Sequence, residues 1–298
     1  ASFLMASRVD LDPAGLYGAD PDYEDWANSP AGLKKMNVGF VYENYLFSEY
    51  KSLGMIPIGF TPAGADSRAA DLELMVGDYS RLSKKPYVPN RVAKIKIEVK
   101  APPADYGQAS LKHNGSSWYV TGKSDPVAQE MIRLLNSMNV AAEVNRAWPG
   151  KPNLFKYSNS GQVPQEEKDA DIKNYPSSYL FGDGFLRTFA SYYKNKNVCY
   201  IQIQGFGLYH LGRDPLGLAK IGVSNILNSG AKMKLRIRTK ASASAGTYRF
   251  STALLMDRNP RPSGFDLDDN EQSSLLHSDA VNARITTAPL ARQRQFFR

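Results

Sequence analysis

The sequence predicts a mixed α/β fold, because helical and strand-like patterns both occur in one chain of 298 residues. Several segments repeat apolar residues at three- or four-residue spacing, which is typical of helices that bury one face. Other segments alternate polar and apolar residues, which is typical of half-buried strands. The composition, with 42% hydrophobic and 22% charged residues, excludes a coiled coil and a wholly disordered chain.

Three segments are expected to form helices. The first runs from Leu33 to Leu53, and Gly54 follows it as a typical stop. The second opens at Asp125, where Pro126 suits the first helical position, and continues to about Asn139. A third and shorter helix is expected between Phe185 and Tyr193.

The clearest strand is Lys94 to Lys100, which alternates polar and apolar residues without a break. Asp71 to Val76 begins with the same alternation, and Val198 to Gln204 forms a third expected strand. Lys232 to Lys240 is a second fully alternating segment, and we expect Tyr248 to Met256 to pair with it.

Charge and cysteine content restrict the class of protein. The chain carries 37 Lys and Arg against 29 Asp and Glu, a formal net charge of +8 at pH 7. Such an excess suits a polyanionic partner such as nucleic acid, and a merely basic protein fits it equally well. No apolar run reaches the roughly 18 residues of a membrane span, so no membrane association is expected. The single cysteine, Cys199, and the absence of a leader-like start fit a cytoplasmic location. A mature secreted protein whose signal has already been removed would look the same.

Four residues on the predicted elements form the candidate catalytic set. Glu43 lies on the first helix, and Asp71 opens a strand. Glu98 and Lys100, two residues apart on the next strand, project from one face. If the two strands pair antiparallel, Asp71 lies beside Glu98. Two adjacent carboxylates are typical ligands of Mg²⁺, and Lys100 would orient a water molecule for attack on a phosphate.

The sequence leaves alternatives at this point. Asp66 or Asp78 is a possible acidic ligand in place of Asp71, which is preferred because it opens a strand. The alternation around Glu98 also fits an exposed strand whose Lys and Glu side chains form cross-strand ion pairs.

The set resembles the motif of the PD-(D/E)-x-K nuclease superfamily, which includes most type II restriction endonucleases. The resemblance covers about residues 35–111 and consists of Tyr42-Glu43, Ala70-Asp71, Glu98-Val99-Lys100 and Tyr106-Gly107-Gln108. Ala70 stands where the superfamily pattern has Pro.

The resemblance implies a restriction-endonuclease-like core, in which helices flank a mixed central sheet. The strand-like segments of the C-terminal half indicate an additional β-rich region. The resemblance also implies that Asp71 and Glu98 bind the metal, that Lys100 assists the water and that Glu43 supports the site. A Gln soon after the Lys strand often lies near the active centre in such nucleases, which points to Gln108.

Three regions are expected on this basis. Residues 1–32 form an irregular N-terminal arm, and residues 33–148 form a nuclease core that carries the metal site. Residues 149–298 form a β-rich region for nucleic-acid recognition or dimerisation. Its alternating strand places five cations on one face, where they would contact the phosphates of DNA. These are Lys232, Lys234, Arg236, Arg238 and Lys240. A solvated sheet face fits the same pattern.

The first functional hypothesis is a Mg²⁺-dependent DNA endonuclease, of the type II restriction class, that cuts both strands of double-stranded DNA as a homodimer. The second is a recombination, repair or viral nuclease that recognises DNA structure. The third is a non-enzymatic nucleic-acid-binding or virion structural protein, in which the acidic set has no catalytic role.

Overall fold

The computed structural model describes residues 30–62, 70–77, 92–157, 163–241 and 248–277. Residues 1–29 of the expected arm lie outside the described residues. Both alternatives to Asp71, namely Asp66 and Asp78, lie outside them as well.

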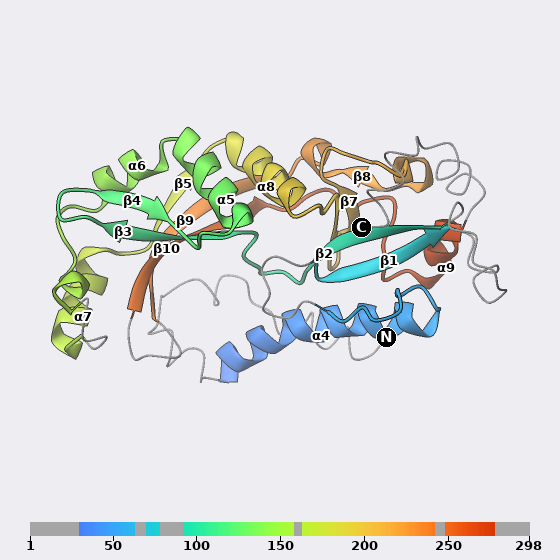
Figure 1. The fold of residues 1–298 in the computed structure, drawn as a ribbon, viewed down its shortest axis with the longest axis horizontal. Helices are drawn as coiled ribbons and strands as arrows, with labels where there is room; N and C mark the ends of the chain where they lie inside the picture. The colour runs from blue at the N-terminus through green and yellow to red at the C-terminus, as the bar shows by residue number, and fades with distance from the viewer. Residues whose placement is uncertain (1–29, 63–69, 78–91, 158–162, 242–247, 278–298) are drawn as a thin grey trace. The chain divides into compact units, whose positions relative to one another are not determined.

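Helices and strands are mixed along the chain, which confirms the α/β class (Figure 1). The helices are α4 (Pro30–Ser52), α5 (Pro126–Ser137), α6 (Val140–Ala147), α7 (Gln165–Asn174), α8 (Gly184–Asn195) and α9 (Asn270–Ser273). The strands are β1 (Leu72–Gly77), β2 (Val92–Lys100), β3 (Gln108–His113), β4 (Trp118–Thr121), β5 (Ser178–Phe181), β6 (Tyr200–Ile203), β7 (Gly207–His210), β8 (Ser224–Asn225), β9 (Lys232–Ala241) and β10 (Tyr248–Arg258). Among the described residues, no helix has the length and apolarity needed to cross a membrane.

The chain folds into two compact units, each built from separate stretches of sequence. The described residues of the sheet-A unit fall within Gly39–Pro102, Tyr193–Ala231 and Arg258–Arg298. The described residues of the sheet-B unit fall within Ala1–Val38, Pro103–Tyr192 and Lys232–Asp257. This differs from the expected contiguous division at residues 32 and 148. The reason is that strands distant in sequence pair within each sheet, as β2 does with β6 and β3 with β10.

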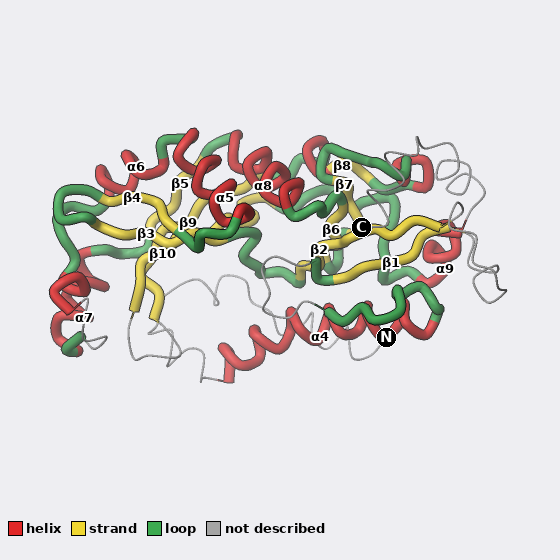
Figure 2. Tube along the Cα trace, in the orientation of Figure 1, coloured by secondary structure: helices red, strands yellow, loops and turns green. Residues whose placement is uncertain are grey.

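Sheet A is mixed, with the strand order β1-β2-β6-β7-β8 (Figure 2). β1 pairs antiparallel with β2, β2 pairs parallel with β6, and β7 again pairs parallel with β8. The alternation seen in the sequence is preserved, because Ile95, Ile97 and Val99 of β2 are all buried. This sheet is mixed as expected, and it carries the candidate catalytic set.

Helix α4 and the segment after β10 are joined to sheet A by buried hydrogen bonds. The Gln202 side chain of β6, fully buried, donates to the Tyr42 hydroxyl of α4 at 3.0 Å and to Asp266 Oδ1 at 2.6 Å. The Tyr50 hydroxyl of α4 donates to the Leu267 carbonyl at 3.0 Å. Because buried polar groups are costly when unpaired, these bonds fix α4 and residues 265–268 against the sheet.

Sheet B has the strand order β4-β3-β10-β9-β5, and α5 and α6 pack against its β4 end. Its core is aromatic. Trp118 of β4 contacts the rings of Trp148, Tyr175 and Phe250 edge to face, with centroids 4.9–5.4 Å apart. Both indole N–H groups donate to backbone carbonyls, so burial leaves neither unpaired.

Candidate active site

Asp71 and Glu98 lie close together at one end of the β1–β2 pair. The antiparallel register ends with Leu72 opposite Ile97. Asp71 directly precedes Leu72, which places it beside Glu98 at this end of the pair. The Val99 backbone N–H donates to Asp71 Oδ2 at 2.9 Å and holds the carboxylate just before the start of β1. The strand pairing predicted from the sequence is therefore present.

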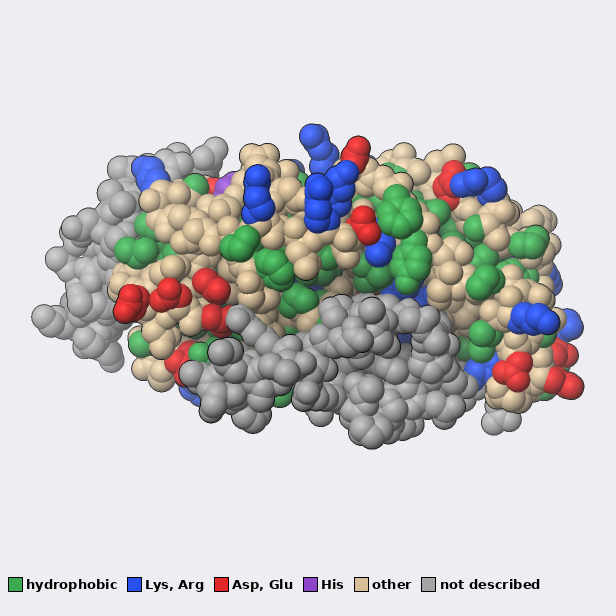
Figure 3. Space-filling view, turned by 180° about the vertical axis from the view of Figure 1, so that it is seen from behind, with side chains coloured by type: hydrophobic (Ala, Val, Ile, Leu, Met, Phe, Trp, Pro, Cys, Tyr) green, Lys and Arg blue, Asp and Glu red, His purple; other side chains and the backbone are tan. Residues whose placement is uncertain are grey.

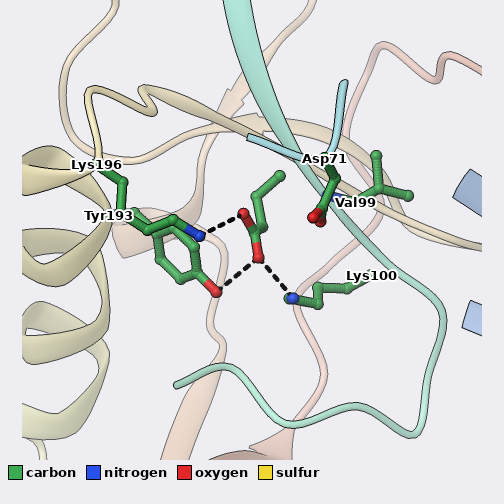
Figure 4. Close-up of polar contacts among 6 residues, drawn as sticks. Asp71, Val99, Lys100, Tyr193 and Lys196 are labelled. Carbon is green, nitrogen blue, oxygen red and sulfur yellow. Dashed lines mark hydrogen bonds and ion pairs between the residues drawn. The ribbon is translucent and has the colours of Figure 1, made fainter. Parts of the chain in front are cut away.

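The Glu98 carboxylate is buried, with 3% of the residue exposed, and three side chains bind it (Figure 4). Lys100 Nζ lies 2.6 Å from Oε1, and the Tyr193 hydroxyl donates to the same oxygen at 2.9 Å. Lys196 Nζ donates to Oε2 at 3.2 Å. A buried carboxylate is stable only when it is paired and hydrogen-bonded. Both oxygens of Glu98 have such partners.

Tyr193 and Lys196 are site residues that the sequence does not predict. They come from the end of α8, where Asn197 adopts the left-handed conformation with φ 56°. The Val198 N–H bonds to the Tyr193 carbonyl at 3.0 Å, and the Asn197 N–H bonds to the Lys194 carbonyl at 3.0 Å. This is a Schellman motif, in which Lys196 is the last residue before the left-handed position. In the sequence, Lys194 and Lys196 are equivalent candidates, and only the fold buries Lys196 while leaving Lys194 exposed.

The pKa values of the two carboxyl groups move in opposite directions. Burial raises the pKa of Asp71, and the Glu98 carboxylate adds to the rise, while the Lys100 ammonium lowers it only in part. Burial also acts to raise the pKa of Glu98, but the ammonium groups of Lys100 and Lys196 outweigh it, and the pKa falls below the usual value. The fold thus stabilises the charge on Glu98 more fully than the charge on Asp71.

The donor set fits a divalent cation of the Mg²⁺ kind. No cluster of three or more His, Cys, Asp and Glu suited to a metal occurs among the described residues. Mg²⁺ is held by one or two protein carboxylates together with water and phosphate oxygens, and Asp71 and Glu98 are the residues that would hold it. The raised pKa of Asp71 also indicates that its charged form would gain from an additional cation nearby.

Glu43 and Gln108 have different positions in the fold. Glu43 is buried, with 8% of the residue exposed, on α4 of the sheet-A unit. Gln108 belongs to the sheet-B unit, at the start of β3. There it donates to Asp105 Oδ2 at 2.8 Å and accepts from Lys240 Nζ at 3.4 Å. The catalytic roles implied for these two residues remain predictions.

The predicted row of cations lies on β9 of the sheet-B unit and is not uniformly accessible. Lys232 is exposed, and Lys234 forms an ion pair with Asp257 at 3.2 Å. Arg236 is only 2% exposed and pairs with Asp105 at 3.3 Å. Arg236 belongs to the part of β9 that pairs with β5, where it lies opposite Tyr179. The expectation that Arg236 presents its charge on an open face is therefore wrong for this conformation.

The other two cations of the row, Arg238 and Lys240, are partly exposed. Arg249 of β10 is exposed and acts on Lys240 as a further positive charge. The coloured surface in Figure 3 carries Lys and Arg side chains in several separate groups, with acidic groups between them. A contact with DNA phosphates through β9 remains a prediction, centred on Lys232, Arg238 and Lys240.

We expect stability to rise with pH above about 8 because of Lys240. Burial and the adjacent Arg238 lower the pKa of Lys240 from 10.5 to about 8 in the folded chain. Between these values the unfolded chain holds the proton and the folded chain does not, so raising the pH favours folding in that window. Urea unfolding at pH 7 and pH 9.5 should show a gain of about 1–2 kcal/mol that Lys240→Met loses. Lys232→Met is the exposed control, and equal gains in both variants would contradict the prediction.

Comparison with known proteins gives one weak structural likeness. HhaI endonuclease in complex with DNA is 13% identical in sequence, with a TM-score of 0.32, over 82% of this chain and 98% of that chain. At this TM-score the likeness supports no inference about activity. No protein-family profile and no curated protein sequence matches the chain.

Proposed function

We propose that the protein is a Mg²⁺-dependent endonuclease that hydrolyses phosphodiester bonds in double-stranded DNA, as type II restriction enzymes do. One observation carries the proposal. Asp71 lies beside Glu98 at one end of the β1–β2 pair, and the Lys100 ammonium lies 2.6 Å from Glu98. Two carboxylates and a lysine in this arrangement can hold a divalent cation and place a positive charge beside the phosphate.

Each residue has a role in the proposed reaction. Asp71 and Glu98 would hold Mg²⁺, which when bound supplies Lewis-acid activation of the phosphate and of water. Lys100 fixes the orientation of Glu98 and would stabilise negative charge that develops on the phosphate. Glu43, buried on α4, and Gln108 are proposed as supporting residues on the motif resemblance alone.

The proposal also includes DNA as the binding partner, a homodimeric state and a cytoplasmic location. The net charge of +8 and the cations of β9 support a polyanionic partner. A homodimer would place one such site on each strand of the duplex. A cytoplasmic location is proposed on the presence of a single cysteine in the chain.

Cleavage of mixed double-stranded DNA tests the proposal. With Mg²⁺ the full chain should yield discrete fragments, and with EDTA it should yield none. Lys100→Met should reduce the rate at least about a hundredfold, because a charge aimed at the phosphate is lost. Lys96→Met is the matched control, since Lys96 lies on the same face of β2 and is partly exposed. Equal rates for the two variants would contradict the role of Lys100.

A non-enzymatic nucleic-acid-binding protein is the second candidate. One observation favours it. The negative charges of Asp71 and Glu98 are formally cancelled by the positive charges of Lys100 and Lys196. Such a network can be purely structural. Salt-sensitive DNA binding without any Mg²⁺-dependent cleavage would support this candidate. Cleavage of branched DNA alone would instead indicate a structure-specific nuclease.

A further inference from the structure

Lys196 is buried and held in place beside the Glu98 carboxylate. Its side chain is 5% exposed, and its ammonium lies 3.2 Å from Glu98 Oε2. The Schellman motif at Asn197 fixes its backbone, and its ammonium lies 5.0 Å from the centre of the Tyr193 ring. Ordering a lysine side chain costs conformational entropy, and here packing already restricts the side chain.

The two oxygens of Glu98 are used differently. Oε1 accepts from Tyr193 and contacts Lys100, which comes from the same strand as Glu98. Oε2 contacts Lys196, which comes from the end of α8 (Figure 4). The carboxylate is therefore held from two sides, and Oε2 is bound by a cation outside the motif.

The charge balance of the site determines how it would respond to a divalent cation. Asp71 and Glu98 contribute two negative charges, and Lys100 and Lys196 contribute two positive charges, so the group is formally neutral. A divalent cation would raise the total to +2 and repel ammonium groups within a few ångströms. Lys196 already holds an oxygen that such a cation would use, so the two positive charges compete for it.

We propose that Lys196 is an internal counter-cation, which neutralises Glu98 in the metal-free protein and competes with the divalent cation for Glu98 Oε2. This inference rests on the proposed function, because it concerns the same pair of carboxylates. It implies that free Mg²⁺ binds weakly and that binding improves when the negative charge of DNA is also present. Lys196 is thus a positioning residue that regulates access to the metal ligands.

Binding of Mg²⁺ alone to the full chain, measured by titration calorimetry without DNA, tests the proposal. Lys196→Met should tighten Mg²⁺ binding at least about tenfold relative to wild type, because a competing charge is removed. Lys194→Met is the matched control, since Lys194 is exposed two residues earlier, and it should bind as wild type does. In EDTA, Lys196→Met should also melt at a lower temperature, because Glu98 loses a partner.

The possible results separate this inference from the proposed function. Unchanged or weaker Mg²⁺ binding in Lys196→Met would overturn the inference and leave the endonuclease proposal standing. Absence of Mg²⁺ binding in every variant, together with absence of Mg²⁺-dependent cleavage, would overturn both. If Lys196→Met does not fold, Lys196→Gln replaces it, because the amide can still donate to Oε2 without a charge. The same tightening is expected for that variant.

Discussion

Asp71→Asn should abolish cleavage without destabilising the metal-free protein. The substitution removes one of two proposed metal ligands, so the rate should fall at least about a hundredfold. The Asn side-chain oxygen can still accept the Val99 N–H that Asp71 Oδ2 accepts at 2.9 Å. Burial and the Glu98 carboxylate raise the pKa of Asp71, so its charged form is held at a cost that Asn avoids.

Three measurements on the same preparation check this result. Cleavage with Mg²⁺ should be lost, while urea unfolding in EDTA should show a free energy equal to or above that of wild type. DNA binding in Ca²⁺ should be retained, because the cations of β9 are unchanged. Wild-type cleavage by Asp71→Asn would show that a different acid, such as Asp66 or Asp78, is the ligand.

Glu98→Ala should have the opposite effect on stability and lower it strongly. Lys100 and Lys196 lose the carboxylate between them, and the Lys196 side chain is 5% exposed. Removing one partner of a buried ion pair typically costs about 3–5 kcal/mol, because it leaves uncompensated buried charge. Urea unfolding in EDTA measures the loss.

A double variant distinguishes buried charge from lost packing. Glu98→Gln keeps the shape of the side chain, and combined with Lys196→Met it removes one positive charge as well. The double variant should be more stable than Glu98→Gln alone if the uncompensated ammonium causes the loss. If the double variant instead loses as much stability as Glu98→Gln and Lys196→Met lose together, lost packing rather than buried charge is the cause.

The sequence predicts the parts of the fold that obey local rules. The alternation of Lys94 to Lys100 predicts β2, and the helix that Asp125 opens is α5, where the Asp125 side chain accepts the Ala128 N–H at 2.9 Å. Gly54 follows the end of α4 as expected. These features depend on neighbouring residues, which is why pattern and capping rules apply to them.

The parts that the sequence does not predict depend on distant contacts. β3 and β4 are only six and four residues long, and β3 also pairs with β10 some 140 residues later. The two compact units are discontinuous in sequence for the same reason, unlike the contiguous regions expected. Arg236 fits the alternation of an exposed face and is nevertheless buried beside Asp105.

The candidate site also contains some residues that local sequence patterns predict and others that only distant contacts bring together. Asp71, Glu98 and Lys100 lie on two strands joined by one connection, so local alternation and an assumed pairing are enough to bring them together. Tyr193 and Lys196 reach Glu98 from 95 and 98 residues away in the chain. Neither spacing nor composition marks Lys196, since it differs from Lys194 only in where the fold turns at Asn197.

The parallel pairing of β2 with β6 has a consequence for biosynthesis. Residues 97–100 align with residues 200–203, so β2 has no partner on that side until the ribosome has made about two thirds of this chain. An edge left open in this way invites association with other nascent polypeptides. Sheet A can therefore be completed only late in synthesis, when β6 has emerged.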